Sequence, residues 1–277
     1  MHLKFGDTTL SLEAPIVMGV LNVTPDSFSD GGRYLSPENA LRRAREMLDE
    51  GVDIVDVGGE STRPGADSVS TEEELQRVIP IIEALAADIP VPVSIDTSKA
   101  EVMRAAVTAG AAMINDVYAL RSPGALETAV ACDVPVCLMH MQGEPRTMQL
   151  APHYDNVVED VAGFLQGRVD EAVAAGMDPG KVIIDPGFGF GKSLDHNLVL
   201  LRSLPRLLQS GYPVLVGMSR KSMIGALLDT PVDNRLHGSI ALAVIAAIQG
   251  AHIIRVHDVK ATRDALRIVR AVYQSDS

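Results

Sequence analysis

Three residues whose side chains accept hydrogen bonds stand at the ends of short apolar runs in this sequence. They are Asp96, Asn115 and Asp185. A single Asp in such a place is often a turn former or a helix N-cap. Three acceptors on separate run ends also suit a ligand that presents several N–H donors along one edge, such as a planar nitrogen heterocycle. We expect these side chains to form one heterocycle site.

A second group of residues has the chemistry of an anion site. Arg255 and His257 are two residues apart at the end of the last apolar run, so their side chains share one face. The helix expected next would add amide donors at its N-terminus. Arg63 follows the second run, and the Asn22 amide oxygen suits Mg²⁺ when substrate phosphates and water supply its other ligands. We expect this group to lie apart from the three acceptors, with the reacting carbon between them.

A glycine-rich segment at 187–193 invites comparison with phosphate-binding loops. The Walker pattern needs Gly where Pro186 stands, and the dinucleotide pattern needs Gly where Lys192 stands. We interpret the segment as a tight loop whose Phe188 and Phe190 either cover a bound ring or serve as hydrophobic anchors. Asp56, which lies inside an apolar run, is interpreted as a structural hydrogen-bonding residue.

The composition describes a globular protein with an acidic surface. Of its 277 residues, 47% are hydrophobic and 22% charged, and the formal net charge is −12 at pH 7. This charge argues against a nucleic-acid partner, because nucleic-acid surfaces need a basic face. An anionic substrate therefore needs a site that concentrates its own cations or metal ions.

Two features bear on the compartment of the protein. No apolar run approaches the roughly 18 residues of a membrane span, and residues 1–7 contain no long apolar stretch, so we expect no secretory signal. Cys132 and Cys137 are the only cysteines, too few for a disulfide framework. We expect a cytoplasmic protein with reduced thiols and no membrane partner.

The apolar runs alternate with segments of helical periodicity. The runs are short, rich in Val or Ile, and lie at 16–21, 54–57, 91–95, 113–114, 134–139, 182–184, 214–216 and 253–256. Such runs suit parallel strands that are covered on both faces. Helix starts are indicated by Ser36 before Pro37 and by the capping-box spacing of Thr71 and Glu74.

Strict strand–helix alternation over eight units predicts an α/β fold, a single (β/α)8 TIM barrel over residues 1–277. An open doubly wound sheet is the alternative. Residues 3–12, divided by Gly6 and Asp7, are predicted to form an N-terminal β-hairpin that caps the other end of the barrel. The segment 239–248 is apolar at nearly every position, so we expect a homodimer interface there. Further packing within the chain is the alternative.

Five motifs resemble those of bacterial dihydropteroate synthase, in order and across nearly the whole chain. They lie at 22–32, 58–66, 185–192, 217–222 and 255–258. One such motif would be suggestive, whereas five together are specific. The resemblance implies a transferase of folate biosynthesis that uses Mg²⁺. Its reaction joins 6-hydroxymethyl-7,8-dihydropterin diphosphate to p-aminobenzoate and releases pyrophosphate.

The resemblance also implies a role for each matching residue. The pterin pocket would comprise Asp96, Asn115, Asp185 and Lys221, with Met139 and Gly217 packing on the ring. Asn22 resembles the Mg²⁺ ligand, and the diphosphate site would comprise Thr62, Arg63, Arg255 and His257. The p-aminobenzoate site would comprise Pro64, Phe190, Ser219 and the Lys221 stem, under a mobile lid at 28–32. The residues expected to be catalytic are Asp96, Asp185, Lys221, Arg255 and His257. Val117 and Tyr118 are less familiar beside Asn115.

The implied chemistry favours dissociative substitution, with direct displacement as the alternative. Loss of pyrophosphate leaves positive charge on the pterin methylene, which nearby carboxylates stabilise until the aromatic amine attacks. Sulfonamides mimic p-aminobenzoate, and family variants that evade them alter the sequence around Phe28 or Pro64. Both residues are present here, so we expect inhibition by sulfonamides.

Other functions remain as alternatives. A pterin-binding methyltransferase barrel shares the carboxylates and the amide but does not need the Asn22 motif, Arg255 or His257. A catalytically silent pterin-binding paralogue would lose the diphosphate residues, which are all retained here. A sugar-phosphate isomerase or aldolase is disfavoured because no catalytic Glu–His pair or Schiff-base lysine stands out, although Lys221 follows the seventh strand.

Overall fold

The computed structural model describes residues 1–23, 37–61, 68–144 and 147–273. Eight parallel strands form the centre of the molecule, in the order β8-β7-β6-β5-β4-β3-β10-β9. They are β3 (Ile16–Asn22), β4 (Ile54–Gly58), β5 (Val93–Asp96), β6 (Met113–Asp116), β7 (Val136–Met139), β8 (Val182–Asp185), β9 (Leu215–Val216) and β10 (Ile253–Val256). A parallel bridge between Ile184 and Val214 joins the two ends of this order. The sheet is therefore a nearly closed barrel, as predicted, and not an open sheet.

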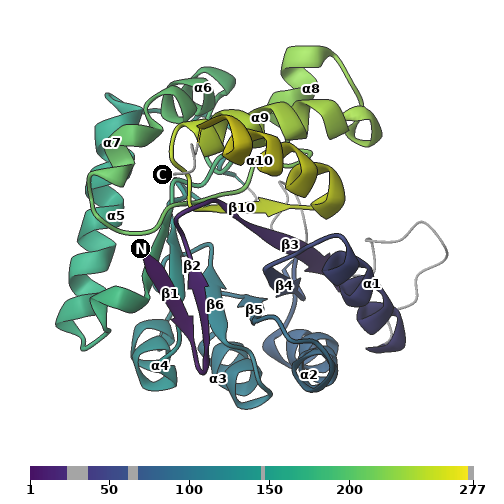
Figure 1. The fold of residues 1–277 in the computed structure, drawn as a ribbon. Coiled ribbons are helices and arrows are strands. Elements are labelled where there is room, and N and C mark those ends of the chain that lie inside the picture. Colours follow the sequence, from purple (N-terminus) through teal and green to yellow (C-terminus); the bar gives the residue numbers. More distant parts are fainter. Residues whose placement is uncertain (24–36, 62–67, 145–146, 274–277) are drawn as a thin grey trace.

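Helices surround the barrel and cover the outer face of its strands (Figure 1). They are α1 (Pro37–Asp49), α2 (Thr71–Asp88), α3 (Ala100–Thr108), α4 (Ala125–Cys132), α5 (Val157–Ala174), α6 (Leu194–Arg202), α7 (Leu204–Leu208), α8 (Ser222–Leu228), α9 (Leu236–Ile248) and α10 (Val259–Tyr273). Short 3₁₀ turns, η2 (Pro179–Lys181) and η3 (Val232–Asn234), precede β8 and α9. None of the helices in the described ranges is long and apolar enough to cross a membrane.

The start of α2 differs from the prediction by one residue. Ser70, not Thr71, is the N-cap, and its side chain accepts a hydrogen bond from the Glu73 backbone N–H at 3.2 Å. With Ser70 as the N-cap, the third helical residue is Glu73, so Glu74 is out of register for a capping box. Its buried carboxylate binds Lys99 instead. Ser36, the predicted cap of α1, lies outside the described residues.

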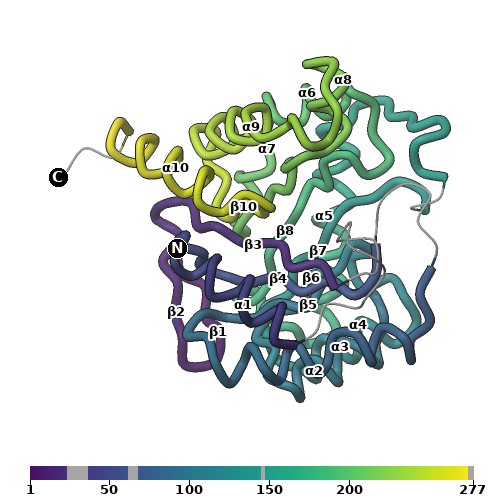
Figure 2. The backbone as a smooth tube through the Cα atoms, turned by 90° about the vertical axis from the view of Figure 1, so that its right-hand side faces the viewer, coloured from purple at the N-terminus to yellow at the C-terminus, as the bar shows by residue number. Residues whose placement is uncertain are grey.

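The N-terminal hairpin closes the end of the barrel at which the strands begin. Strands β1 (His2–Phe5) and β2 (Thr8–Ser11) pair antiparallel, as predicted. Leu3 and Phe5 are buried in one apolar cluster with residues from the barrel interior, including Ile16 and Met113. Figure 2 shows the hairpin beside the start of β3. The opposite end, at the carboxyl ends of the strands, is left for a site.

Helix α9 is apolar on its outer face as well as its inner one. Leu242 and Ala243 are buried, whereas Ile245 and Ile248 remain 43% and 47% exposed. Helix α10 lies beside α9 in both views (Figures 1 and 2) and also carries exposed apolar residues, Ile268 among them. Packing among the described residues therefore covers only part of the apolar surface of α9.

Candidate functional site

Four residues form one row across neighbouring strands at the carboxyl end of the barrel. Asn22 pairs in register with Gly58, Gly58 with Asp96, and Asp96 with Asn115. A Cβ atom placed on Gly58 would lie 3.5 Å from Asn22 Oδ1 and 3.8 Å from Asp96 Oδ2. The amide and the carboxylate therefore flank a position that has no side chain. The predicted heterocycle acceptors on β5 and β6 and the predicted metal ligand on β3 lie on the same rim.

Arg255 ties this row to a buried carboxylate below it. Its Nε donates to Asp56 Oδ2 at 2.6 Å, and one terminal nitrogen donates to Asp96 Oδ2 at 2.7 Å. Asn115 Nδ2 also donates to Asp56 Oδ2, at 3.2 Å. Asp56 is fully buried, and its Oδ2 accepts the structural hydrogen bonds predicted for it, whereas its buried Oδ1 has no hydrogen-bond partner among the described residues. The sequence predicts that the cations lie apart from the heterocycle acceptors. For Arg255 this is wrong, because its long side chain reaches from β10 to Asp56 on β4 and Asp96 on β5.

Burial sets the charge balance of this cluster. It raises the pKa of Asp96 to about 7, although the attraction of Arg255 acts in the opposite direction. Burial opposes the charge of Arg255, but Asp56 and Asp96 outweigh it and raise its pKa above the usual value. Two carboxylates thus share one permanent cation. A ligand that offers N–H donors or positive charge fits this arrangement better than an anion does.

Asp185 and Lys221 occupy the next part of the rim. Asp185 is buried at the end of β8, its Oδ1 accepts from the Gly187 backbone N–H at 2.7 Å, and burial raises its pKa. Lys221 Nζ donates to the Phe188 carbonyl and lies 4.5 Å from the Phe190 ring centre. Burial lowers the pKa of Lys221 to about 8, with Asp185 opposing that shift. Lys221 therefore joins the loop after β8 to the loop after β9.

An apolar wall lines the rim between β6 and β8. Val117, Met139, Met141 and Met148 form a buried cluster, with Tyr118 and Phe190 packed against it. Val117 and Tyr118 are thus part of this wall. Phe188 is fully buried in the main core and is an anchor, so the alternative that it covers a ligand ring is wrong. Phe190 is partly exposed and remains available to a ring.

Ser219 and His257 form a contact that sequence reasoning missed. Ser219 Oγ lies 3.0 Å from His257 Nδ1 and accepts from the His257 backbone N–H at 3.2 Å. The family resemblance places Ser219 in the p-aminobenzoate site and His257 in the diphosphate site. Gly217, two residues before Ser219, faces the Arg255 stem, since a Cβ there would lie 3.7 Å from Arg255 Cβ. The absence of a side chain at Gly217 makes room for Arg255.

Several predicted site residues lie outside the described ranges. They are Thr62, Arg63, Pro64 and the lid at 28–32, so their predicted roles stay predictions. The residues that the structure does describe contain no cluster of three or more His, Cys, Asp or Glu arranged to hold a metal. Asn22, with the Asp96 carboxylate beside it, fits Mg²⁺ only if substrate oxygens and water supply the other ligands.

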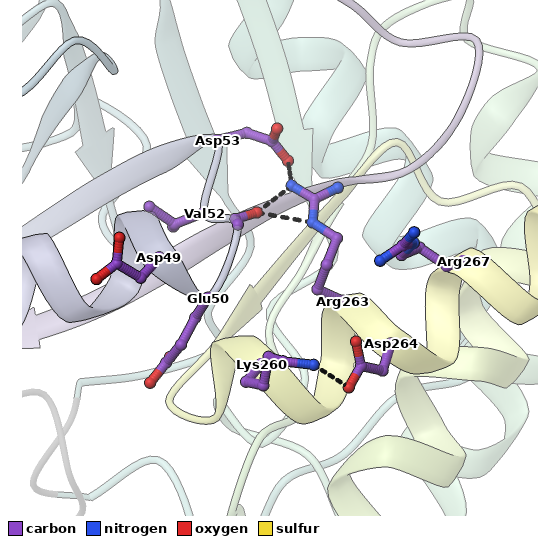
Figure 3. A pocket seen from close by; sticks show the side chains of 9 residues that line it. Asp49, Glu50, Val52, Asp53, Lys260, Arg263, Asp264 and Arg267 are labelled. Carbon is purple, nitrogen blue, oxygen red and sulfur yellow. Dashed lines mark hydrogen bonds and ion pairs between the residues drawn. The ribbon is translucent and has the colours of Figure 1, made fainter.

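A separate cavity lies outside the barrel, between the end of α1 and helix α10 (Figure 3). Its volume is about 510 Å³, and its lining includes Asp53, Lys260, Arg263 and Asp264. The charges there are largely paired: Arg263 binds Asp53 and the Gly51 carbonyl, and Lys260 binds Asp264 (Figure 3). This cavity therefore lacks the convergent acceptors of the barrel rim.

The fold and the rim define a TIM-barrel protein whose strand ends gather the acceptors that a polar heterocycle needs. The family model for "pterin binding enzyme" matches residues 18–257. The dihydropteroate synthases of Haemophilus influenzae and Escherichia coli (strain K12) are 55% and 56% identical over 271 residues. Each alignment covers 98% of this chain, with 98% and 96% of the respective relative. The chain therefore belongs to the pterin binding enzymes, and within them to the dihydropteroate synthase family of transferases.

Solved structures agree with this assignment. The Yersinia pestis dihydropteroate synthase, solved with a sulfonamide drug complex, has a TM-score of 0.96 and 54% identity, covering 99% of this chain and all of that one. The Xanthomonas albilineans enzyme in complex with 7,8-dihydropteroate has a TM-score of 0.91 and 49% identity, with both chains fully covered. The barrel fold is thus shared with proteins that were solved with such ligands.

Proposed function

We propose that this chain, acting as one pterin-binding domain, catalyses the dihydropteroate synthase reaction of folate biosynthesis. It would condense 6-hydroxymethyl-7,8-dihydropterin diphosphate with p-aminobenzoate to give 7,8-dihydropteroate and pyrophosphate, an alkyl or aryl transfer other than methyl transfer. The observation that carries the proposal is the cluster of Asp96, Asn115 and Asp185 on one rim, held by Arg255 and bordered by Lys221.

The rim matches the pterin edge. Amino and ring N–H groups of a pterin are donors, and Asp96, Asn115 and Asp185 present carboxylate or amide oxygens. The wall formed by Met139 and its neighbours offers an apolar surface for the ring. The Lys221 ammonium lies 4.5 Å from the centre of the Phe190 ring at the same mouth, where the second aromatic substrate would bind. Two rings can therefore be placed side by side.

The charges on the rim support a dissociative substitution. The carbon–oxygen bond to the diphosphate breaks first, and the electron pair leaves with pyrophosphate. Positive charge then develops on the pterin methylene, and the Asp96 and Asp185 carboxylates stabilise it. The amine nitrogen of p-aminobenzoate attacks the methylene carbon and afterwards loses a proton. No covalent bond to the protein is needed, and direct displacement is the competing route.

Arg255 and His257 stand on the β10 side of the rim, where the diphosphate would leave, but we assign them different roles. Arg255 is already paired with two carboxylates, so we assign it chiefly to holding the pterin side of the site. His257, tied to Ser219, is the nearer candidate for a diphosphate oxygen. Asn22 would hold Mg²⁺, which when bound neutralises charge on the leaving group.

One assay tests the proposal against its rivals. The purified protein is given the pterin diphosphate and Mg²⁺, and pyrophosphate release is followed with and without p-aminobenzoate. We expect 7,8-dihydropteroate with both substrates, and slow pyrophosphate release without the amine if the dissociative route holds. A methyltransferase or a silent pterin-binding protein would form no dihydropteroate. A sulfonamide should inhibit product formation in competition with p-aminobenzoate.

The exposed apolar face of α9 and α10 supports a homodimer. Ile245, Ile248 and Ile268 lie on this face and would be covered by a second copy. Ile245→Asp should convert a dimer into a monomer in sedimentation at micromolar concentration, whereas a monomeric parent protein would refute the dimer. A cytoplasmic location is part of the same proposal, supported by the free cysteines Cys132 and Cys137.

A further inference from the structure

Lys192 is a buried lysine that the proposed reaction does not use. It is 3% exposed, and its Nζ lies 2.9 Å from the Gly187 carbonyl and 3.0 Å from the Phe190 carbonyl. The same Nζ lies 2.8 Å from His140 Nδ1 and 3.4 Å from the His140 carbonyl. None of these partners is a carboxylate. Burial lowers the pKa of Lys192 to about 7, while the charge of Asp185 opposes this shift. Burying such a group among neutral acceptors is costly, which indicates that its contacts hold the surrounding backbone in place.

The partners of Lys192 belong to two neighbouring rim segments. Gly187 is held from both sides: its N–H by Asp185 Oδ1 at 2.7 Å and its carbonyl by Lys192. Its φ is +67°, a conformation that glycine adopts at no steric cost. The other segment follows β7, where the His140 N–H donates to the Asp185 carbonyl at 2.9 Å. Lys192 therefore fastens the ends of β7 and β8 around Asp185.

His140 is suited to be an acceptor in this arrangement. Burial, together with the charge of Lys192, lowers its pKa to about 2, so the ring is neutral and Nδ1 can accept. The ring packs edge-on against Phe164, with centroids 4.9 Å apart. Tyr154, whose hydroxyl donates to the Gly191 carbonyl at 2.7 Å, holds the same loop from outside. The acceptors of Lys192 are thus fixed before any substrate arrives.

We propose that Lys192 is a positioning residue for both substrate sites. Its ammonium fixes the loop 187–191, so that the Asp185 carboxylate faces the pterin and the Phe190 ring faces p-aminobenzoate. Lys221, which binds the Phe188 carbonyl of the same loop, depends on this position as well. Lys192 itself touches neither substrate. The proposal rests on the proposed function, because the sites that it organises are the two substrate sites.

The test is Lys192→Met, which keeps the length of the side chain and removes every donor. The matched control is Lys4→Met, at an exposed position of the hairpin on the opposite end of the barrel. Three quantities are measured: the Kd of 6-hydroxymethyl-7,8-dihydropterin by calorimetry, KM and kcat for both substrates, and urea unfolding. We expect Lys192→Met to raise the pterin Kd about tenfold and both KM values, while Lys4→Met matches the parent protein.

A role in stability alone gives a different result. Lys192→Met would then lower the unfolding midpoint but leave the Kd and both KM values unchanged under conditions where it is folded, and the inference would be wrong. If Lys192→Met does not fold, His140→Phe keeps the ring and removes one acceptor of Lys192. It should raise the pterin Kd about threefold, and an unchanged Kd would overturn the inference. Failure of the parent protein and Lys4→Met to bind the pterin would instead refute the proposed function.

Discussion

The guanidinium of Arg255 lies 2.7 Å from Asp96 Oδ2, although the two residues are 159 positions apart in the sequence. The same guanidinium binds Asp56, which is fully buried. This contact makes one cation the common partner of two carboxylates before any substrate binds. A diphosphate would have to compete with both of them for Arg255. The contact therefore favours a role for Arg255 in organising the pterin side of the site.

Replacing Arg255 tests how much the two carboxylates depend on it. Arg255→Met leaves Asp56 and Asp96 buried without a cation, which should destabilise the fold by about 3–5 kcal/mol. The pKa of Asp96, which burial already raises, should rise further in the folded state without the opposing attraction of Arg255. When the pKa of an acid is higher in the folded state than in the unfolded state, the folded state loses stability as pH rises. The loss begins near the unfolded pKa, about 4 for Asp, and continues up to the folded pKa. Urea unfolding should therefore show a larger loss at pH 8 than at pH 5.

The control for Arg255→Met is Arg45→Met, which breaks an exposed ion pair with Asp88. It should change stability little at either pH, because exposed pairs are screened by water. If Arg255→Met lost the same stability at pH 5 and pH 8, the carboxylates would not be the cause.

The pH dependence of kcat/KM should be bell-shaped. Asp96, whose pKa burial raises to about 7, must be ionised to stabilise the pterin cation, so activity should rise with pH through this value. Lys221, whose pKa burial lowers to about 8, must keep its proton, so activity should fall above this value. Lys221→Arg keeps a cation at higher pH and should move the alkaline limb upward. An alkaline limb that stays in place would assign it to another group.

Asp185→Asn should weaken pterin binding by about ten- to a hundredfold. The substitution replaces an ionic acceptor, and a hydrogen bond to charge contributes about 1.5–3 kcal/mol. Asp178→Asn is a matched control, because the exposed Asp178 accepts from the Gly180 N–H at 2.8 Å in the same i,i+2 geometry. Calorimetry with 6-hydroxymethyl-7,8-dihydropterin measures both variants. Equal affinities for Asp185→Asn and the parent protein would remove Asp185 from the pterin site.

Ser219→Ala separates the subsites. The sequence alone predicts an effect on p-aminobenzoate only, whereas the contact with His257 predicts a weaker second effect on the pterin diphosphate. KM should rise for both substrates, with no change in the Kd of the pterin alcohol, which lacks the diphosphate. Lys221→Ala should raise that Kd as well. If Ser219→Ala weakened the pterin alcohol as much as Lys221→Ala does, this division would fail.

Gly187→Ala should be far more damaging than Gly211→Ala. Both glycines have positive φ, +67° and +80°, so each substitution carries a backbone cost of about 1–2 kcal/mol. A Cβ at Gly187 would in addition lie only 1.9 Å from the His140 carbonyl oxygen, whereas a Cβ at Gly211 meets nothing within 4 Å. Gly187→Ala should displace the loop 187–191, whose Gly187 N–H binds Asp185, and should lower kcat/KM. Urea unfolding and steady-state kinetics measure the pair, and equal effects would contradict the crowding at Gly187.

The sequence by itself determined the barrel, the rim and the family. Eight apolar runs separated by helical segments specify parallel strands, and parallel strands place all their carboxyl ends on one rim. Asp96, Asn115 and Asp185 could therefore be placed together without coordinates. Asp56 also gave a signal, as a charged residue within an apolar run. Phe188 and Phe190 could not be told apart, because their period-two spacing in a loop does not say which side faces the core.

Only the tertiary structure decided which polar groups bind each other. Arg255 meets Asp56 from 199 residues away, Lys192 meets His140 from 52, and Lys99 meets Glu74 from 25. Such pairs depend on the stagger of the strands and on how far each side chain reaches across the closed barrel. Local sequence fixes the rise and periodicity of one strand or helix, but it does not specify these distances. They arise when the barrel closes and buries charges that must then find a partner.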